Sequence, residues 1–253
     1  TLPSSFYTDS RKFEYIREGF SHYWHFAAHE SQLSGKSAIE LRHLESLLGE
    51  PMMLVAGDEI RCMSNVCTHR GMLLIDGSCS RSTLQCPYHG RTFGLDGCMK
   101  SMPEFDLVED FPTTQDDLRI FPSISWKGLF FTGLEPSGLE ACLEEMEARI
   151  GWIPIETFEH DHSRNRCYEI SANWALYVDN YLEGFHIPFV HNDLNSALDY
   201  DEYRTEIFDG GVLQIGIASD GEPTFEIPEE SPDFGLKVAA YYYWIYPGLM
   251  LNF

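Results

Sequence analysis

The chain has 253 residues, 43% of them hydrophobic, and a formal net charge of −23. That length and hydrophobic content suffice for a buried core and for one or two domains. The negative charge disfavours nucleic acids and anionic membrane surfaces as partners. No apolar run approaches the roughly eighteen residues of a membrane span, and no signal peptide is visible at Thr1–Ser5.

The pattern of residues 22–133 predicts a small β-rich domain. Met52–Ala56 and Glu59–Val66 are separated by a Gly-Asp pair, which is typical of a tight hairpin turn. A second hairpin turn is expected at Phe93–Gly97. Ile124–Leu134 is rich in aromatic residues and is expected to form one closing strand.

Two short cysteine–histidine motifs fall within this domain. Cys67 and His69 belong to one loop, Cys86 and His89 belong to another, and each loop ends in glycine. Two thiolates and two imidazoles can hold a 2Fe–2S cluster in which the cysteines bind one iron and the histidines bind the other. Such a cluster has a higher reduction potential than an all-cysteine ferredoxin and passes one electron at a time.

A structural zinc site is the main alternative, because two cysteines and two histidines also suit tetrahedral Zn²⁺. Zinc motifs usually open with two ligands separated by two to four residues, whereas a single residue separates Cys67 from His69. A purely structural interpretation of the four residues requires both motifs to arise by chance. The iron–sulfur interpretation is therefore favoured.

The stretches Asn65–Gly71 and Cys86–Gly90 resemble the Rieske signature of ring-hydroxylating oxygenase α subunits. Arg91 is a local departure, because many members of that family have Trp after the second glycine. The position lies beside the cluster-binding loop rather than on a ligand, so the ligand assignment is unaffected.

A helix is expected over Ser137–Ile150, because Ser137 and Glu140 form a capping-box pattern and Gly151 can end the helix. Its apolar residues share one face: Leu139, Leu143, Met146 and Ile150. Arg166–Ile170 is expected to be a strand that enters a second domain. This second domain takes residues 1–21 and 134–253.

The segment Asn173–His191 contains a second group of polar residues. Asp179, Glu183 and His186 are spaced i, i+4 and i+7, so on a helix they form a stripe that is costly to bury without partners. A metal or a charge network is therefore expected. The apolar residues of the segment recur with helical period and predict a helix with one buried side: Trp174, Tyr177, Val178, Tyr181, Leu182 and Phe185.

His186 and His191 would point about 140° apart on a straight helix, because five residues at roughly 100° each overshoot a turn. Pro188 disfavours helix at Ile187 and breaks the hydrogen-bond ladder, so His191 can turn back toward His186. Two imidazoles and a carboxylate on one face of an iron form the facial triad of non-haem Fe(II) oxygenases. Taken singly, each histidine would more often be a packed core residue.

The spacing Asp179-x3-Glu183-x2-His186-x4-His191 resembles the mononuclear-iron motif of the same oxygenase family, in which the first acid is more often Glu and the second Asp. The resemblance implies Fe(II) at His186 and His191, with Asp179 as a supporting acid. It also implies that Glu183 bridges toward His89 of a neighbouring subunit, as a carboxylate that hydrogen-bonds histidines of both centres.

The resemblance further implies an α+β protein that functions as a homotrimer. A β-rich Rieske domain of the ISP-like type would precede a helix-grip catalytic domain of the START/Bet v1-like type. The family's third iron ligand is an acid on a later helix, and this sequence does not identify it. Asp193 and Asp199 lie near His191, but no motif supports either.

The sequence stops at Phe253, shortly after the aromatic segment Tyr241–Pro247, which is expected to form sheet. A sheet that ended there would have unpaired edges and exposed aromatic side chains. We therefore expect the chain to be truncated at its C-terminal side.

The resemblance implies the terminal oxygenase component of a Rieske non-haem iron system. A ferredoxin or reductase would deliver electrons from NAD(P)H to the cluster, and Fe(II) would activate O₂ to hydroxylate an organic, expected aromatic, substrate. Such a mono- or dioxygenase would serve aromatic hydrocarbon catabolism. Seven cysteines without a disulfide pattern favour a cytoplasmic location.

Two alternatives stay open at this point. One is a Rieske monooxygenase or demethylase that acts on a quaternary amine or a methoxy compound. The other is a Rieske electron-transfer protein without oxygenase activity, which would need the first motif alone.

Overall fold

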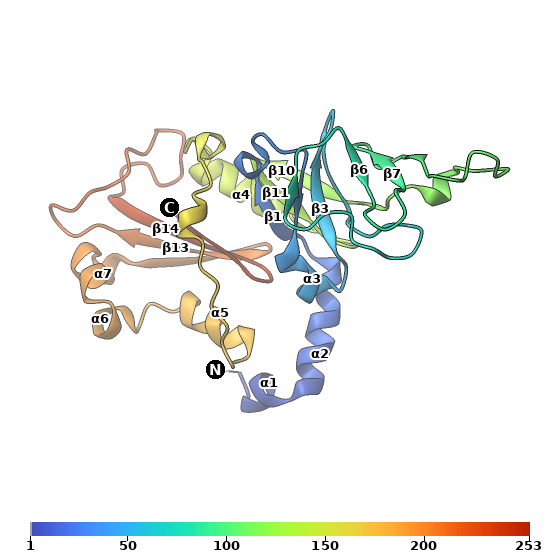
Figure 1. Ribbon diagram of the computed structural model, residues 1–253. Coiled ribbons are helices and arrows are strands. Elements are labelled where there is room, and N and C mark those ends of the chain that lie inside the picture. The colour runs from blue at the N-terminus through green and yellow to red at the C-terminus, as the bar shows by residue number, and fades with distance from the viewer. Residues whose placement is uncertain (1) are drawn as a thin grey trace. The chain divides into compact units, whose positions relative to one another are not determined.

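The computed structural model describes residues 2–253, which contain seven α-helices and fifteen strands. The chain divides into two compact units (Figure 1). One consists of Phe20–Pro136 and Ile155–Asn165, and the other of Thr1–Gly19, Ser137–Pro154 and Arg166–Phe253. Within the described part of the chain, no helix has the length and apolar character needed to cross a membrane.

The unit that contains Phe20–Pro136 is built from three antiparallel sheets, with strand orders β1-β11-β10, β5-β2-β3-β4-β9 and β6-β7-β8. Its strands are β1 (His25–His29), β2 (Ala38–Glu40), β3 (Met52–Ala56), β4 (Ile60–Ser64), β5 (Ser78–Cys79), β6 (Thr83–Gln85), β7 (Thr92–Gly94), β8 (Met99–Ser101), β9 (Ile120–Phe121), β10 (Ser123–Trp126) and β11 (Leu129–Thr132). Its helices are α3 (Arg42–Leu48) and the 3₁₀ turns η1 (Phe20–His22), η2 (Glu30–Leu33), η3 (Thr114–Asp116), η4 (Ile155–Thr157) and η5 (His162–Arg164).

The core of this unit extends directly beneath the two cysteine–histidine loops. The predicted hairpins are confirmed as β3–β4 and β7–β8. Met63 on β4 and Phe93 on β7 are fully buried, and they belong to the same apolar cluster as Cys67 and Cys86. The loops are therefore anchored by side chains of the core.

The single strand predicted over Ile124–Leu134 is wrong. The segment forms a hairpin of two strands, β10 and β11, in which Ser123 pairs with Thr132 and Trp126 with Leu129. Lys127 and Gly128 connect them with φ values of 47° and 78°. Two consecutive residues with positive φ are typical of the type I′ hairpin turn, whose twist matches that of the flanking strands.

The other unit contains one antiparallel sheet with strand order β12-β13-β14-β15. Its strands are β12 (Arg204–Phe208), β13 (Gly211–Ile217), β14 (Val238–Ile245) and β15 (Leu249–Asn252). Its helices are α1 (Ser4–Thr8), α2 (Ser10–Gly19), α4 (Glu140–Ile150), α5 (Trp174–Leu182), α6 (Ile187–Val190), α7 (Asn192–Ala197) and the 3₁₀ turn η6 (Tyr200–Glu202). Figure 1 shows β13 and β14 side by side, and the sheet predicted at Tyr241–Pro247 is confirmed by β14.

The two faces of this sheet differ in character because side chains alternate along each strand. Leu213 and Ile215 on β13 pair with Tyr243 and Tyr241 on β14, and all four side chains are fully buried. Gln214 lies between them in sequence and therefore projects from the opposite face, where it pairs with Tyr242.

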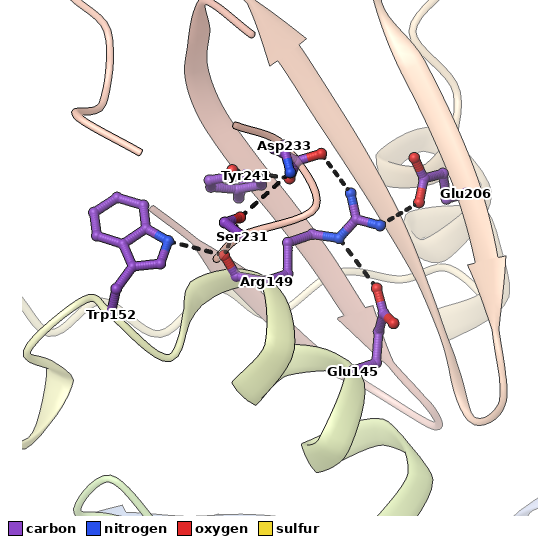
Figure 2. A network of polar contacts seen from close by, with 7 residues as sticks. All are labelled: Glu145, Arg149, Trp152, Glu206, Ser231, Asp233 and Tyr241. Atoms are coloured by element: carbon purple, nitrogen blue, oxygen red, sulfur yellow. Dashed lines mark hydrogen bonds and ion pairs between the residues drawn. The ribbon is translucent and has the colours of Figure 1, made fainter. Parts of the chain in front are cut away.

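A buried arginine joins α4 to the sheet (Figure 2). Arg149 is 7% exposed, and its guanidinium binds Asp233 at 2.8 Å, Glu206 at 2.6 Å and Glu145 at 3.1 Å. The hydroxyl of Tyr241 donates to the second oxygen of Asp233 at 2.9 Å. One cation thus connects α4, β12, β14 and the loop before β14.

The helix expected over Ser137–Ile150 is confirmed in part. The helix begins at Glu140 rather than Ser137, and Leu139 precedes it without a side-chain cap, so the expected capping box is absent. The predicted apolar face is confirmed, since Leu139, Leu143, Met146 and Ile150 are all buried.

Arg166–Ile170 is not a strand, and Tyr168 and Ile170 are 78% and 63% exposed. Its apolar residues matched a strand pattern, but a strand forms only where a neighbouring strand supplies hydrogen bonds. No strand of residues 2–253 pairs with this segment.

We predict that Asp233→Ala lowers the free energy of unfolding by about 3 kcal/mol, the lower end of the cost of breaking a buried ion pair. Arg149 would remain buried with only two of its three carboxylate partners. Urea unfolding followed by tryptophan fluorescence measures the change. Asp220→Ala is the matched control, because Asp220 pairs with Lys237 on the surface and its side chain is 97% exposed. Equal stability of the two variants would contradict the prediction.

Candidate metal centres

The two cysteine–histidine loops share one backbone structure. The first follows β4 and the second follows β6. In each loop the glycine four residues after the cysteine donates its amide to the cysteine carbonyl, Gly71 to Cys67 at 3.0 Å and Gly90 to Cys86 at 3.1 Å. Both glycines have positive φ, 71° and 74°, a conformation that glycine adopts without strain.

These loops bring the four predicted cluster ligands together. The rings of His69 and His89 lie edge to face with centroids 4.9 Å apart. Cys67 and Cys86 are 2% and 3% exposed, and both belong to the apolar core cluster. The cysteines therefore lie on the core side of the group, whereas His69 is half-buried and His89 is exposed.

The donor set fits a 2Fe–2S cluster with one cysteine-bound and one histidine-bound iron. Burial raises the pKa of the Cys67 thiol, and the adjacent Cys86 raises it further. Desolvation and the neighbouring His89 lower the pKa of His69, so its imidazole is neutral, the form that binds metal. The assignment of the four residues as ligands remains a prediction.

Two supporting residues of this site were not anticipated. Asn65 is fully buried, and its side chain donates to the carbonyl of Ile75 at 2.9 Å and accepts from the amide of Ile75 at 3.0 Å. Thr68 donates its hydroxyl to the carbonyl of Asp116 at 2.7 Å. An asparagine at the end of an apolar strand was the sequence signal for Asn65. No sequence signal indicated Thr68, because its partner Asp116 lies in a distant loop.

The second predicted site lies where α5 ends and α6 begins. Glu183 follows α5 in an extended conformation, and Pro188 lies in the first turn of α6. The expected break at Pro188 is therefore wrong, because proline is tolerated in the first turn of a helix. The chain bends five residues earlier, at Glu183, and His186 and His191 flank α6 with ring centroids 5.1 Å apart.

The buried side predicted for this segment is wrong in part. Ala175 and Val178 are the buried residues of α5, whereas Tyr177 and Phe185 are 60% and 77% exposed. The helical repeat of apolar residues ends with the helix at Leu182, so Phe185 does not share a face with the residues before it.

The carboxylate of Glu183 orients the first of the two histidines. One oxygen lies 2.5 Å from Nδ1 of His186, and the other accepts the amides of Phe185 at 2.6 Å and His186 at 3.3 Å. A carboxylate on Nδ1 fixes the tautomer in which Nδ1 carries the proton, so Nε2 is free to bind metal.

A pocket of about 170 Å³ contains Glu183, His186 and His191. Across from these residues it is lined by the polar face of the sheet, where Gln214 is 2% exposed. The side chain of Gln214 donates to the carbonyl of Tyr181 at 2.7 Å and accepts from the hydroxyl of Tyr203 at 3.1 Å. Gln214 was not anticipated, although a single polar residue within the apolar strand Gly211–Ile217 was a visible signal.

The other acidic candidates lie outside this pocket. Asp179 on α5 accepts a hydrogen bond from the hydroxyl of Tyr7 on α1. Asp193 lies in the first turn of α7, and Asp199 caps η6. Among residues 2–253, no three His, Cys, Asp or Glu side chains are grouped as ligands of a single metal ion.

Comparison with known proteins matches both parts of the chain to domain families. The Rieske [2Fe-2S] domain matches residues 23–112, and the catalytic domain of the ring hydroxylating alpha subunit matches residues 155–253. These domains take a Rieske 2Fe–2S cluster and a non-haem iron, and in this family electrons come from NAD(P)H through a partner protein.

Curated relatives extend over the whole chain. The carnitine monooxygenase oxygenase subunit of Escherichia coli (strain K12) is 29% identical over 260 residues, which cover 100% of this chain and 67% of the relative. The chloroplastic choline monooxygenase of Amaranthus tricolor is 29% identical over 265 residues, which cover 100% of this chain and 57% of the relative.

Solved structures show the same fold. A quaternary ammonium Rieske monooxygenase, described in connection with carnitine oxidation by gut microbiota and inter-subunit electron transfer, has a TM-score of 0.80 and 28% identity. The match covers 100% of this chain and 68% of that one. Naphthalene 1,2-dioxygenase from Rhodococcus sp. has a TM-score of 0.78 at 23% identity, over 100% of this chain and 64% of that one, and this likeness is one of fold.

We predict that the full-length protein contains about three irons and two labile sulfides per chain, two irons from the cluster and one mononuclear. Cys67→Ser should lose both sulfides and two irons, whereas His186→Ala should lose one iron and keep the sulfides. Colorimetric iron and sulfide analysis measures both. Cys98→Ser is the control, because Cys98 is exposed outside the ligand loops. Zinc without sulfide in the unmodified protein would instead support the zinc alternative.

Proposed function

We propose that this chain, which belongs to the Rieske oxygenase α subunits, is the terminal component that uses O₂ and electrons from a partner protein to hydroxylate a small organic substrate. The main support is the presence of two donor sets in one chain. A simple electron carrier needs the cysteine–histidine loops alone, and it has no use for the pocket that holds Glu183, His186 and His191.

We assign the cluster to a domain of residues 22–133 and the mononuclear iron to a domain of residues 1–21 and 134–253. Cys67, His69, Cys86 and His89 would hold the cluster, and His186 and His191 would hold the iron. When bound, the cluster supplies electrons singly and the iron binds and reduces O₂. The protein's part is to exclude water at the cysteines, to hold the tautomer of His186 through Glu183, and to position substrate in the pocket.

Electron transfer between the two centres is proposed to cross a subunit boundary. His89 is the exposed ligand of the first site, so it can meet a second chain without rearrangement of the core. Glu183 would accept a hydrogen bond from His89 of the partner subunit while it holds its own His186. A ring of three subunits satisfies this contact at every chain, and a ferredoxin or reductase would dock on the same assembly.

The substrate favoured by the pocket and the relatives is a quaternary ammonium compound. Three tyrosines line the pocket, and aromatic rings bind alkylammonium groups through cation–π attraction: Tyr181, Tyr203 and Tyr242. The net charge of −23 would also attract a cation to the protein. Carnitine and choline monooxygenases carry such substrates in their names, whereas the likeness to naphthalene dioxygenase is one of fold. An aromatic hydrocarbon is therefore the less favoured of the two substrate classes.

A cytoplasmic location is proposed on the chemistry of the thiols. All seven cysteines lie in the described part of the chain, and they are free thiols. Free cysteines and a thiolate-bound cluster suit a reducing compartment.

We predict that Glu183→Gln lowers coupled hydroxylation by roughly 10- to 100-fold while both metal centres stay loaded, because the neutral amide loses the charge that orients and couples the histidines. Turnover with the partner reductase and iron analysis test this together. Glu222→Gln, a surface change of the same type, is the control. Undiminished hydroxylation in Glu183→Gln would contradict the bridging role.

We predict coupled oxygenation of choline or L-carnitine, measured by O₂ uptake and mass spectrometry of the product. The matched test is 3,3-dimethylbutan-1-ol, in which a carbon replaces the nitrogen of choline. Its kcat/KM should be lower by roughly 2- to 30-fold, the range that corresponds to one cation–π contact. Equal rates for the two, or oxygenation of indole alone, would contradict a cationic substrate.

A further inference from the structure

Arg91 is a buried cation that joins the two cluster-binding loops. It follows the second loop directly, and it is 4% exposed. Its Nη1 donates to the hydroxyl of Thr68 at 2.6 Å, and Thr68 stands between Cys67 and His69 in the first loop. Its backbone carbonyl accepts the amide of Cys86 at 2.8 Å. The guanidinium therefore binds the first loop between its two predicted ligands, while the backbone of the same residue closes the second loop.

The charge of Arg91 is paired on one side. Its Nη2 lies 2.6 Å from a carboxylate oxygen of Asp116. The other oxygen of Asp116 accepts the amide and the hydroxyl of Thr113 at 2.9 and 3.1 Å. These bonds from Thr113, together with Arg91, lower the pKa of Asp116, so the pair is ionised at neutral pH.

A structural link alone would not require this side chain. The Nε of Arg91 is buried, and among the described residues it has no hydrogen-bond partner. A buried guanidinium with an unsatisfied donor is a costly way to connect two loops, and neutral side chains of similar volume often do so at equal or lower cost. The cost is explained if the charge itself has a role.

We propose that Arg91 raises the reduction potential of the Rieske cluster by stabilising its reduced form. The inference rests on the proposed cluster at Cys67, His69, Cys86 and His89. One electron passes from the donor protein into the cluster, the cluster becomes more negative by one unit, and no bond forms or breaks. A fixed cation beside the cluster lowers the energy of that added charge. Asp116 offsets part of the effect, so removal of each partner should shift the potential in opposite directions.

Potentiometric titration of the full-length protein with dithionite, followed by the electron paramagnetic resonance signal of the reduced cluster, tests this directly. At the midpoint potential of the unmodified protein, Arg91→Met should lower the ratio of reduced to oxidised cluster about tenfold, which is about 59 mV for a one-electron couple. Asp116→Asn should raise that ratio. Arg91→Lys keeps the charge and should stay close to the unmodified protein.

An unchanged potential in Arg91→Met, with lower thermal stability or cluster content, would mean that Arg91 only joins the loops and would overturn the proposal. A shift in Arg91→Lys as large as in Arg91→Met would also overturn it, because charge would not be the cause. If Arg91→Met fails to hold a cluster, Asp116→Asn decides, and a lower or unchanged potential there counts against the proposal. A missing Rieske signal in the unmodified protein would instead refute the proposed function.

Discussion

A backbone hydrogen bond from a glycine amide to a cysteine carbonyl closes each cluster-binding loop, and the geometry of the first site depends on it. The two loops have the same spacing from cysteine to glycine, yet the histidine is the second residue after Cys67 and the third after Cys86. The same turn thus presents the imidazole from two different positions. Glycine is required at the closing position, because φ is positive there and a Cβ on Gly90 would lie 3.1 Å from the ring of Pro103.

The two faces of the sheet β12-β13-β14-β15 differ in function: one packs in the core with α4, and the other lines the pocket. One face carries the buried pairs of Leu213 with Tyr243 and Ile215 with Tyr241, and on that face Arg149 joins α4 to the sheet. The opposite face carries Gln214 and Tyr242, which line the pocket with the two histidines. Period-two alternation keeps these sets apart. Substitutions in the pocket can therefore alter substrate binding without removing the ion pairs that hold the helix.

Local spacing identified the two cysteine–histidine loops, because the two predicted ligands of each loop lie within one turn, and the structure brings the histidines of the two loops together. The histidine pair was predicted correctly as neighbours, but for the wrong reason, since the bend lies at Glu183 and not at Pro188. The hairpins with recognisable turn residues were predicted from the sequence. The turn at Lys127-Gly128 was missed, because it lies within an aromatic segment. Arg166–Ile170 matched a strand in composition but has no partner strand among residues 2–253. The side-chain partners of Arg91, Gln214 and Arg149 could not be predicted, because most of them are distant in sequence.

The hydrogen bonds of Glu183 bear on the proposed link between subunits. An ionised carboxylate offers about four lone pairs, and Glu183 uses one oxygen for His186 Nδ1 and the other for the amides of Phe185 and His186. One acceptor position is therefore left, on the oxygen that already faces the imidazole. A single N–H donor from a neighbouring chain would complete the set, and it would place one carboxylate between two histidines. Glutamate is one methylene longer than the aspartate that is more common at this position of the family, and its carboxylate would make the proposed contact in addition to the bonds within its own turn.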